Sequence, residues 1–431
     1  MRPAARIAAA IEILDTILNR HQPTSLALAD WGKSHRFAGS ADRNAIGSLV
    51  YDALRKRLSL AWAMGSETPR ALALGAALKT FMMTPEVLVA ECNGKDHAPE
   101  KLSEQEQVGL VRSEAEAPDF IRANIPEWLW TSFHKTFGPR AVEEGRHLAE
   151  RAPTDLRINT LKVVREKVLK ALAEFNVRPT PFSPIGVRVP IAIGTARTPN
   201  LEAEAAFQAG WFEIQDEGSQ VAALLADVGP QMQILDLCAG SGGKTLALAG
   251  QMQNKGQIYA YDKDRLRLKP IFSRIQRAGV RNVQVLKGGD QNALQALGQK
   301  FDRVIVDAPC SGTGVWRRRP ESKWRLKAKS LEERTLEQEK VLATASQLVK
   351  PGGRIVYITC SLLPQENSLQ IEKFLSQNRP FSLIPYEKIW KERLPDTLPQ
   401  SALNTPLTLQ LTPASHGTDG FYVAILQRSV S

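Results

Sequence analysis

Apolar residues recur at intervals of three and four positions through the first third of the chain. Residues 4–19 carry four of them on one helical face, namely Ile7, Ile11, Leu14 and Leu18. Residues 40–65 continue the same spacing, and residues 126–138 show it again. This spacing predicts amphipathic helices that share a core. The polar run at residues 92–107 lacks the pattern and is expected to be a loop.

Farther along the chain the apolar runs become short. Residues 155–162 and the proline-broken residues 177–190 predict a small mixed α/β segment. Five apolar runs then alternate with helical spacing: residues 233–237, 256–262, 282–288, 301–309 and 352–361. Two C-terminal runs, residues 381–386 and 420–428, are expected to add strands.

Strands that alternate with helices build a parallel sheet with helices on both faces. The clearest of these helices is expected over residues 331–349. In such a sheet, ligands bind beyond the carboxyl ends of the strands. We therefore expect an α/β protein in three parts: an all-α domain at residues 1–140, a small α/β domain at 141–228 and the large-sheet domain at 229–431.

The chain has 431 residues, a formal charge of +11 and a pI near 9.5. Such a positive field favours polyanionic partners, nucleic acid above all. No apolar run has the length of a membrane span, and Glu12 and Asp15 interrupt the first one, so neither a membrane segment nor a signal peptide is expected. The four cysteines include no CxxC pair, which predicts a reducing, cytoplasmic setting without a disulfide framework or a metal site.

The stretch DLCAGSGGKT at residues 236–245 directly follows an apolar strand. A phosphate-binding P-loop needs glycine where Cys238 stands, which weighs against a nucleoside triphosphatase. A turn for a nucleoside cofactor instead needs glycines that let the ligand approach the backbone, and three are present: Gly240, Gly242 and Gly243. The acid that binds ribose hydroxyls in such a site lies roughly 20 residues on, and Asp262 has this position.

Other reactive side chains lie at neighbouring strand ends. Asp264 is expected to cap the helix after the second strand. Asp290, after the third strand, either contacts the adenine or sugar of a cofactor or caps a helix. Cys310 follows the fourth strand and Cys360 follows the fifth. Two thiols at one ligand-binding edge, beside a cofactor turn, predict thiol chemistry.

These stretches resemble the Sun/Fmu (RsmB-like) family of S-adenosylmethionine-dependent RNA cytosine-5 methyltransferases. The matching stretches, in family order, are RINTLK, DLCAGSGGKT, AYDKDRLRL, VDAPCSGTGVWRRRPE, PGGRIVYITCSLLPQEN and HGTDGFYVAIL. The resemblance implies a Rossmann-like methyltransferase domain with a mostly parallel seven-stranded sheet. The helical N-terminus, through DRNAIGSLVYDALR, resembles a NusB-like RNA-binding domain. The family more often has Ala-Pro where this chain has Gly240-Ser241, and glycine tolerates the same turn, so cofactor binding is expected to be retained.

The resemblance also implies roles for single residues. Cys360 would attack carbon 6 of the cytosine, and Cys310 would assist release of the methylated product. In DNA cytosine methyltransferases a Pro-Cys cysteine attacks instead, so swapped roles stay open. Lys244 could lower the pKa of the thiol, and Asp307 could bind the cytosine amino edge. The residues expected to hold S-adenosylmethionine are Cys238, Ala239, Gly240, Ser241, Gly242, Gly243, Lys244, Asp262, Asp290 and Asp307.

The basic stretch WRRRPESKWR at residues 316–325 directly follows the Pro-Cys motif. Four of its residues are expected to contact RNA, namely Trp316 (with Trp324 as the alternative stacking residue), Arg317, Arg318 and Arg319. The expected substrate is 16S ribosomal RNA, with transfer RNA as the alternative. A nucleic-acid-dependent NTPase and a non-catalytic ribosome-assembly factor are the other candidate functions. The protein is expected to act as a monomer.

Overall fold

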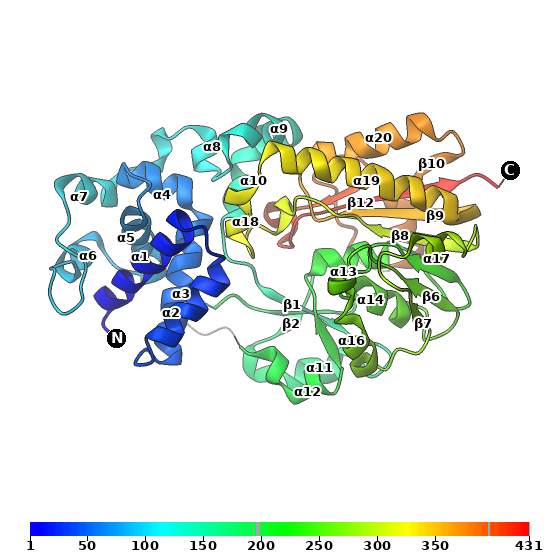
Figure 1. Cartoon of the computed structure of the whole chain (residues 1–431), viewed down its shortest axis with the longest axis horizontal. Helices are drawn as coiled ribbons and strands as arrows, with labels where there is room; N and C mark the ends of the chain where they lie inside the picture. The colour runs from blue at the N-terminus through cyan, green and yellow to red at the C-terminus, as the bar shows by residue number, and fades with distance from the viewer. Residues whose placement is uncertain (193, 195–198, 395–396, 431) are drawn as a thin grey trace. The chain divides into compact units, whose positions relative to one another are not determined.

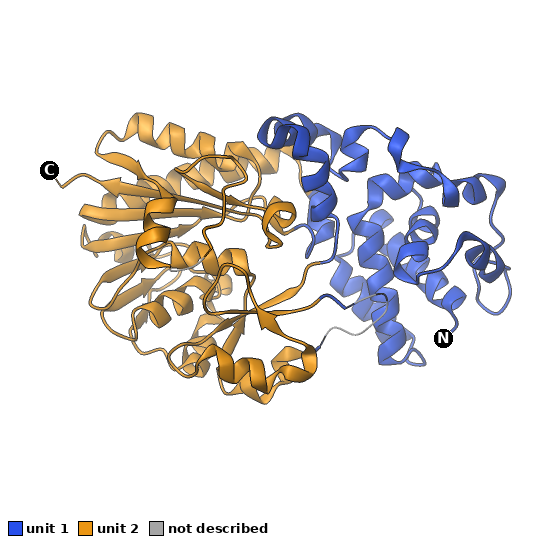
Figure 2. Cartoon of the chain, turned by 180° about the vertical axis from the view of Figure 1, so that it is seen from behind, with its two compact units in different colours: residues 1–151, 191–199, 316–325 blue, residues 152–190, 200–315, 326–431 orange. Residues whose placement is uncertain are grey.

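The computed structural model describes residues 1–192, 194, 199–394 and 397–430 (Figure 1). Its chain forms two compact units, which Figure 2 colours separately. Unit 1 consists of residues 1–151, 191–199 and 316–325, and unit 2 consists of residues 152–190, 200–315 and 326–431. No described helix is both long enough and apolar enough to cross a membrane. The domain boundaries expected at residues 140 and 228 stay predictions.

Unit 1 contains no strand among its described residues. Its α-helices are α1 (Pro3–Asn19), α2 (Thr24–Ser34), α3 (Ser40–Arg55), α4 (Arg57–Met64), α5 (Pro69–Thr80), α6 (Pro85–Glu91), α7 (Glu104–Val111), α8 (Asp119–Arg122), α9 (Glu127–Phe137), α10 (Ala141–Leu148) and α18 (Pro320–Arg325). α1 and α9 confirm the helices predicted over residues 4–19 and 126–138. Ile7 and Leu14 of α1 are fully buried against α3 and α5, because the apolar spacing places them on one face.

The helix predicted over residues 40–65 is interrupted in the structure. Lys56 separates α3 from α4, and its backbone lies outside the helical region. Asn124 accepts a hydrogen bond from the backbone amide of Ser59 (3.1 Å) and donates one to the Ser59 hydroxyl (3.1 Å). A side chain 65 residues away therefore accepts a hydrogen bond from a backbone amide in the first turn of α4. The local spacing of apolar residues could not indicate this contact.

The polar run expected to be a loop is a loop only in its first part. At the start of α7, Ser103 accepts a hydrogen bond from the amide of Glu106 (3.2 Å), and the Glu106 carboxylate accepts one from the amide of Ser103 (3.0 Å). This reciprocal capping box starts a helix and is visible in the sequence as S-x-x-E. The prediction of a loop through residue 107 is therefore wrong.

Lys323 of α18 buries its ammonium group among residues of unit 1. Its Nζ donates to the carbonyl oxygens of Asn124 (2.9 Å) and Arg55 (3.1 Å) and lies 4.8 Å from the ring centre of Trp324. Burial lowers the pKa of Lys323 to about 7, and the positive charge of Arg55 acts in the same direction.

This buried amine should make folding stability depend on pH. The folded pKa of Lys323, about 7, lies below its ordinary value of 10.5, so between these values the unfolded chain binds more protons. The free energy of unfolding should therefore rise with pH in this window, by up to about 1.4 kcal/mol per pH unit from this group. Lys323→Met should remove that slope in urea denaturation at several pH values, whereas Lys329→Met, at an exposed position, should keep it. An unchanged slope in Lys323→Met would contradict the assignment.

Unit 2 begins with a small antiparallel sheet in the order β2-β3-β1-β4. Its strands are β1 (Thr154–Ile158), β2 (Arg178–Pro179), β3 (Gly186–Val189) and β4 (Phe212–Ile214), and its helices are α11 (Arg165–Ala171) and α12 (Ala205–Gln208). Apolar side chains from β1, β3, β4 and α11 form the core of this segment. The mixed α/β segment predicted from residues 155–162 and 177–190 is confirmed.

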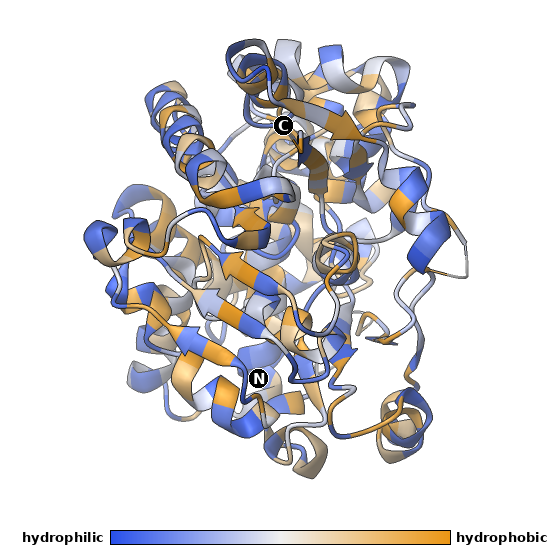
Figure 3. Ribbon diagram, turned by 90° about the vertical axis from the view of Figure 1, so that its right-hand side faces the viewer, coloured by the Kyte–Doolittle hydropathy of each residue, from blue (hydrophilic) through white to orange (hydrophobic). Residues whose placement is uncertain are grey.

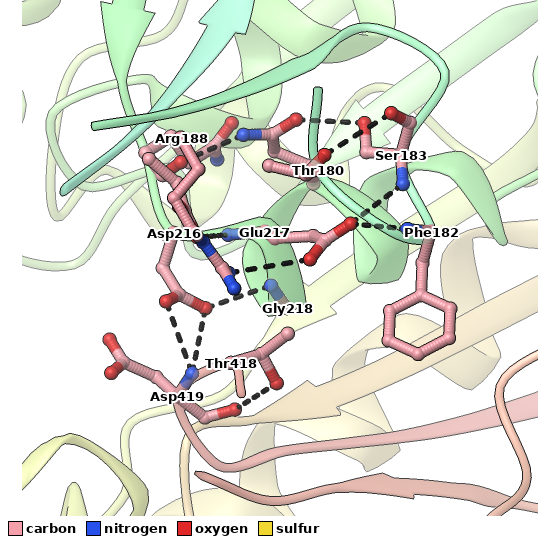
Figure 4. A network of polar contacts seen from close by, with 12 residues as sticks. Thr180, Phe182, Ser183, Arg188, Asp216, Glu217, Gly218, Thr418 and Asp419 are labelled. Atoms are coloured by element: carbon pink, nitrogen blue, oxygen red, sulfur yellow. Dashed lines mark hydrogen bonds and ion pairs between the residues drawn. The ribbon is translucent and has the colours of Figure 1, made fainter. Parts of the chain in front are cut away.

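A buried network of charges connects the small sheet to the rest of unit 2 (Figure 4). Arg188 of β3 pairs with Asp155 of β1 (2.6 Å) and with Glu217 (3.4 Å), the first residue of α13 (Glu217–Leu224). Burial raises the pKa of Glu217. The neighbouring Asp216 carboxylate accepts a hydrogen bond from the amide of Asp419 (3.0 Å). Two ion pairs therefore hold the small sheet and α13 together, and a hydrogen bond from a backbone amide to the Asp216 carboxylate adds the segment around residue 419.

The large sheet has the strand order β10-β12-β9-β8-β5-β6-β7, and β11 pairs with β12. Its strands are β5 (Gln233–Asp236), β6 (Gln257–Ala260), β7 (Val283–Val285), β8 (Phe301–Asp307), β9 (Val349–Thr359), β10 (Phe381–Ile384), β11 (Leu409–Leu411) and β12 (Phe421–Arg428). The strands from β9 to β7 are parallel, whereas β12 is antiparallel to its neighbours. All seven predicted strands are present, so the predicted mostly parallel, Rossmann-like sheet is confirmed, and β11 is an addition.

Helices cover both faces of the large sheet because strand side chains alternate. On β8, Ile305 belongs to one apolar core, and Val304 and Val306 belong to the other; the apolar strands are orange in Figure 3. The helices of the first core are α13, α14 (Gly243–Gln251), α16 (Ile271–Ala278) and α21 (Tyr386–Arg393). Those of the second are α17 (Gln291–Gln295), α19 (Ala328–Leu348) and α20 (Ser368–Gln377), and α19 confirms the helix predicted over residues 331–349. The short helices α15 (Arg265–Leu268) and α22 (Pro413–His416) complete unit 2.

Candidate active site

The two cysteines at neighbouring strand ends lie in contact. Cys310 follows β8 and Cys360 follows β9, and these strands are adjacent and parallel. Their Sγ atoms are 3.4 Å apart, and both side chains are partly exposed. The carboxyl ends of parallel strands share one edge of a sheet, which is why residues 50 positions apart can meet here.

Close backbone packing supports the segments that carry the cysteines. The amide of Gly314 donates to the carbonyl oxygen of Cys360 (2.9 Å), and the amide of Gly420 donates to the carbonyl oxygen of Gly314 (2.9 Å). A Cβ atom on Gly420 would lie 2.7 Å from the Cα atom of Gly314, which no side chain tolerates. Gly420, the second glycine of the HGTDGF stretch, is thus required for the close approach to Gly314, whose amide binds the carbonyl oxygen of Cys360.

The surroundings raise the pKa of Cys310. Its hydrogen bond with the Cys360 sulfur raises the pKa of Cys310 well above the ordinary thiol value, and burial and the negative charge of Glu366 add to the effect. Either thiol can donate the hydrogen bond between the two sulfurs. Because the thiolate and not the thiol is the nucleophile, the raised pKa weighs against Cys310 as the attacking residue.

Lys244 is directed at a carboxylate and not at the cysteines. Its Nζ forms an ion pair with Oδ2 of Asp307 (2.8 Å) and donates to the hydroxyl of Ser219 (3.3 Å). Lys244 is buried in the first turn of α14, whereas the Asp307 side chain, at the end of β8, is 35% exposed. The contacts of Lys244 thus hold Asp307 in place, and none of them supports the expected effect of Lys244 on a thiol pKa.

The glycine-rich turn connects β5 to α14. Gly240 (φ 51°) and Gly242 (φ 85°) have left-handed backbone conformations, which glycine adopts without strain. Asp262, just beyond β6, accepts hydrogen bonds from the amides of Gly240 (2.8 Å) and Asp264 (2.8 Å). The Asp264 carboxylate accepts hydrogen bonds from two amides in the first turn of α15, so its predicted role as a helix cap is confirmed.

Two arginines that the sequence did not single out hold this turn. Arg157 of β1 donates to the carbonyl oxygen of Gly243 (2.7 Å), and burial lowers the pKa of Arg157 to about 10. Arg274 of α16 donates to the carbonyl oxygen (3.0 Å) and the hydroxyl (2.8 Å) of Ser241, and it pairs with Glu213 (2.8 Å). Arg157 lies in the RINTLK stretch, which marked it without assigning a role, whereas no local pattern marks Arg274.

A cleft of about 740 Å³ opens beside the turn, a volume that suits a nucleoside-sized ligand. Its apolar lining includes Leu237, Tyr261, Leu294, Pro309 and Val341. Its polar lining includes Cys238, Asp262, Asp264 and Gln291, together with four residues of α19 that the sequence did not indicate: Arg334, Glu337, Lys340 and Thr344.

The residues expected to hold a cofactor separate into two groups. Cys238 and Asp262 line the cleft, whereas the others lie outside its lining: Ala239, Gly240, Ser241, Gly242, Gly243, Lys244, Asp290 and Asp307. The Asp290 carboxylate accepts a hydrogen bond from the amide of Ala293 (3.0 Å) and caps α17, which was its alternative role. The next residue, Gln291, lines the cleft instead.

The basic stretch at residues 316–325 belongs to unit 1 and packs against α3. Trp316 is 1% exposed and Arg317 is 4% exposed, so the expectation that these side chains contact RNA does not fit their positions. Trp324, the alternative stacking residue, donates its indole hydrogen bond to the carbonyl oxygen of Leu54 (2.7 Å). Of the three arginines, Arg319 is the exposed one.

Comparison with protein families gives two matches. The family described as 16S rRNA methyltransferase RsmB/F matches residues 222–427, which include the glycine-rich turn after β5, Cys310 and Cys360. A second family, described as the RsmF/B-like ferredoxin-like domain, matches residues 125–193, which include β1, β2 and β3.

Similar proteins cover much of the chain. A probable ribosomal RNA small subunit methyltransferase B from Synechocystis sp. is 34% identical over 71% of this chain and 67% of its own length. A ribosomal RNA small subunit methyltransferase B from Shewanella oneidensis is 32% identical over 75% of this chain and 71% of its own length. Among solved structures, that of PH0851 matches with a TM-score of 0.73 and 26% identity, covering 99% of each chain.

Proposed function

The chain belongs to the 16S rRNA methyltransferase RsmB/F family and is an RNA methyltransferase, and we propose that it methylates carbon 5 of a cytosine in 16S ribosomal RNA. The observation that carries the proposal is the 3.4 Å contact between the sulfurs of Cys310 and Cys360. Carbon 5 of cytosine is a poor nucleophile, and it must be activated by covalent addition to the ring. Methyl transfer to an oxygen or a nitrogen atom of RNA needs no such thiol.

The proposed reaction is covalent catalysis by Cys360. Its thiolate adds to carbon 6 of the cytosine, so electron density moves onto carbon 5, which would form its bond to the methyl carbon as the bond between that carbon and the donor's sulfur breaks. The proton on carbon 5 then passes to water, and the electron pair of that C–H bond restores the double bond while the bond between carbon 6 and the Cys360 sulfur breaks. Cys310 is the neutral thiol beside the departing sulfur, and its hydrogen bond stabilises the expelled thiolate. The target base must leave its stack to reach this site.

S-adenosylmethionine is the proposed donor and, when bound, would supply the methyl group from a sulfonium centre. The lining of the cleft fits its nucleoside part. Asp262 offers a carboxylate for ribose hydroxyls, and Leu237, Leu294 and Val341 offer apolar walls for the adenine ring. The left-handed backbone at Gly240 leaves room for close approach to the turn.

Asp307 is the proposed contact for the amino group of the target cytosine. It stands at the end of β8 with its side chain partly exposed, and Lys244 holds one of its carboxylate oxygens. A carboxylate held in this way can accept a hydrogen bond from the cytosine amine with its other oxygen. Arg318 and Arg319 remain the proposed phosphate contacts.

The direct test is methyl transfer from radiolabelled S-adenosylmethionine to purified RNA. Incubation with a 16S ribosomal RNA transcript should label the RNA, and bisulfite sequencing should locate 5-methylcytosine at one position. A transfer RNA transcript in parallel tests the alternative substrate, and ATP hydrolysis with RNA tests the NTPase alternative. Label that enters no RNA, or that resides on an atom other than carbon 5, would refute the proposal.

Asp262 should govern cofactor affinity. In Asp262→Asn one carboxylate oxygen becomes an amide NH2, which cannot accept the hydrogen bonds that a charged carboxylate accepts from ribose hydroxyls and the Gly240 amide. The Kd for S-adenosylmethionine, measured by calorimetry, should rise about 10- to 100-fold, because hydrogen bonds to charged groups contribute about 1.5–3 kcal/mol. Asp119→Asn is the control for the same change of side chain, because Asp119 is exposed, belongs to α8 of unit 1 and does not line the cleft. Equal affinities for both variants would exclude the ribose contact.

A further inference from the structure

Glu366 is a buried carboxylate to which the sequence assigned no role. It ends a short 3₁₀ turn, Pro364–Glu366, beyond β9, and its side chain is fully buried. It belongs to the stretch LLPQEN, residues 362–367, which begins two residues after Cys360. Burial of a carboxylate away from water costs free energy unless hydrogen bonds satisfy its oxygens. The hydrogen-bond partners of Glu366 therefore indicate its role.

The partners of Glu366 come from both cysteine segments. Oε1 accepts a hydrogen bond from the amide of Ser311 (2.7 Å), and Oε2 accepts hydrogen bonds from the hydroxyls of Ser311 and Ser361 (2.5 Å for Ser361). The side-chain amide of Gln338, from α19, donates to Oε1 (3.1 Å). Among the ion pairs of the described residues, none involves Glu366, so four neutral donors satisfy this carboxylate.

The two serines have the same place relative to the two cysteines. Ser311 directly follows Cys310, and Ser361 directly follows Cys360. Consecutive Cα atoms are about 3.8 Å apart, so fixing each serine also constrains the cysteine before it. One carboxylate therefore connects two segments whose sulfurs lie 3.4 Å apart.

We propose that Glu366 is a positioning residue, whose carboxylate joins the turn after Cys310 to the turn after Cys360 and thereby holds the two sulfurs at contact distance. The inference rests on the proposed function for its catalytic consequence. Its geometric part concerns the protein alone and needs neither RNA nor cofactor. Charge-assisted hydrogen bonds are shorter and stronger than neutral ones, which suits a carboxylate that must hold two segments in register.

The geometric part is tested with phenylarsine oxide, a reagent that bridges two neighbouring thiols. In the wild-type protein it should protect both Cys310 and Cys360 from iodoacetamide, as peptide mass spectrometry would report. Glu366→Ala, which removes every acceptor of the junction, should lose this joint protection. Ser361→Ala keeps the carboxylate and removes one of its donors, so it should lose part of the protection and remain informative if Glu366→Ala does not fold. Glu372→Ala, at an exposed position on α20, is the control and should behave as wild type.

The kinetic part uses the same variants in methyl transfer. Glu366→Ala should lower kcat about 100-fold, because a displacement of about 1 Å between reacting groups has an effect of that size. The KM for S-adenosylmethionine should stay unchanged, since Glu366 does not line the cleft. A loss that appeared in KM and left kcat intact would contradict positioning.

A third readout separates positioning from simple packing. The titratable described groups that face Cys310 are Cys360, Tyr357 of β9 and Glu366. In Glu366→Gln the negative charge disappears and the size is kept, so the pH dependence of Cys310 alkylation should shift to lower pH.

The outcomes distinguish this inference from the proposed function. Joint protection that persists in Glu366→Ala and Ser361→Ala overturns the positioning role, whatever the kinetics. Loss of protection in a protein whose wild type methylates no RNA supports the positioning role and refutes the proposed function. A fall in kcat with full protection means that Glu366 acts by another route, and this too overturns the inference.

Discussion

Cys360→Ala is expected to abolish methyl transfer while leaving cofactor binding intact. Without the thiolate, no bond forms at carbon 6 and carbon 5 stays unreactive, so kcat should fall by about 10⁴-fold or more, as for other lost nucleophiles. Cys360 does not line the cleft, so the Kd for S-adenosylmethionine should stay within about twofold of the wild-type value. The measurements are radiolabelled methyl transfer to 16S ribosomal RNA and calorimetry with the cofactor.

Cys238→Ala is the informative control for this variant. Cys238 is also a free cysteine and lines the cleft. Burial raises the pKa of the Cys238 thiol well above its ordinary value, so this thiol is protonated at neutral pH and is a poor nucleophile. Cys238→Ala should therefore retain methyl transfer at saturating cofactor. Methylation that persisted in Cys360→Ala would show that another group attacks the base.

Cys310→Ala is expected to trap a covalent complex between the protein and RNA. In the proposed mechanism a neutral Cys310 thiol, whose sulfur lies 3.4 Å from that of Cys360 and whose pKa is raised, donates a hydrogen bond to the Cys360 sulfur when it departs as a thiolate. Removal of this donor should slow the breaking of the bond between carbon 6 and sulfur more than its formation. The RNA-linked protein should then accumulate as a slower band on a denaturing gel, with methyl label in the band.

The double variant identifies the sulfur that forms the bond. Cys310→Ala combined with Cys360→Ala should give no slower band, because the attacking thiol is missing. A band from Cys360→Ala alone would instead assign the attack to Cys310, which is the arrangement known from DNA cytosine methyltransferases. The raised pKa of Cys310 predicts that this band is absent at neutral pH.

Much of unit 2 could be predicted because its local patterns are strong. The alternation of apolar runs and helical spacing predicted the seven strands from β5 to β12 other than the short β11. The capping role of Asp264 was also predictable, because a cap involves only neighbouring residues. Asp290 shows the limit of such predictions, because a carboxylate at the end of a strand can bind a ligand or cap a helix. Only the structure shows that it accepts a hydrogen bond from the amide of Ala293 and caps α17.

Contacts that depend on how helices pack could not be predicted. The sequence suggested that Lys244 acts on a thiol, but in the structure its ammonium group pairs with Asp307 at the end of β8. The basic run at residues 316–325 has the composition of an RNA-binding loop, yet Trp316 and Lys323 are buried in unit 1. The composition of residues 316–325 gives the charge of this segment, whereas the burial of its side chains depends on the helix against which the segment packs.

The amino-acid sequence by itself determined the order of strands and helices, the glycine turn, and the presence of one cysteine after each of two strands that end at the same edge. These features follow from periodicity and from the backbone freedom of glycine, both of which are local. Only the tertiary structure decided that Glu366 joins the two cysteine segments and that Arg157 and Arg274 hold the cofactor turn. Such partners are separated by up to 86 positions, and a side chain finds them only after the sheets and helices have packed.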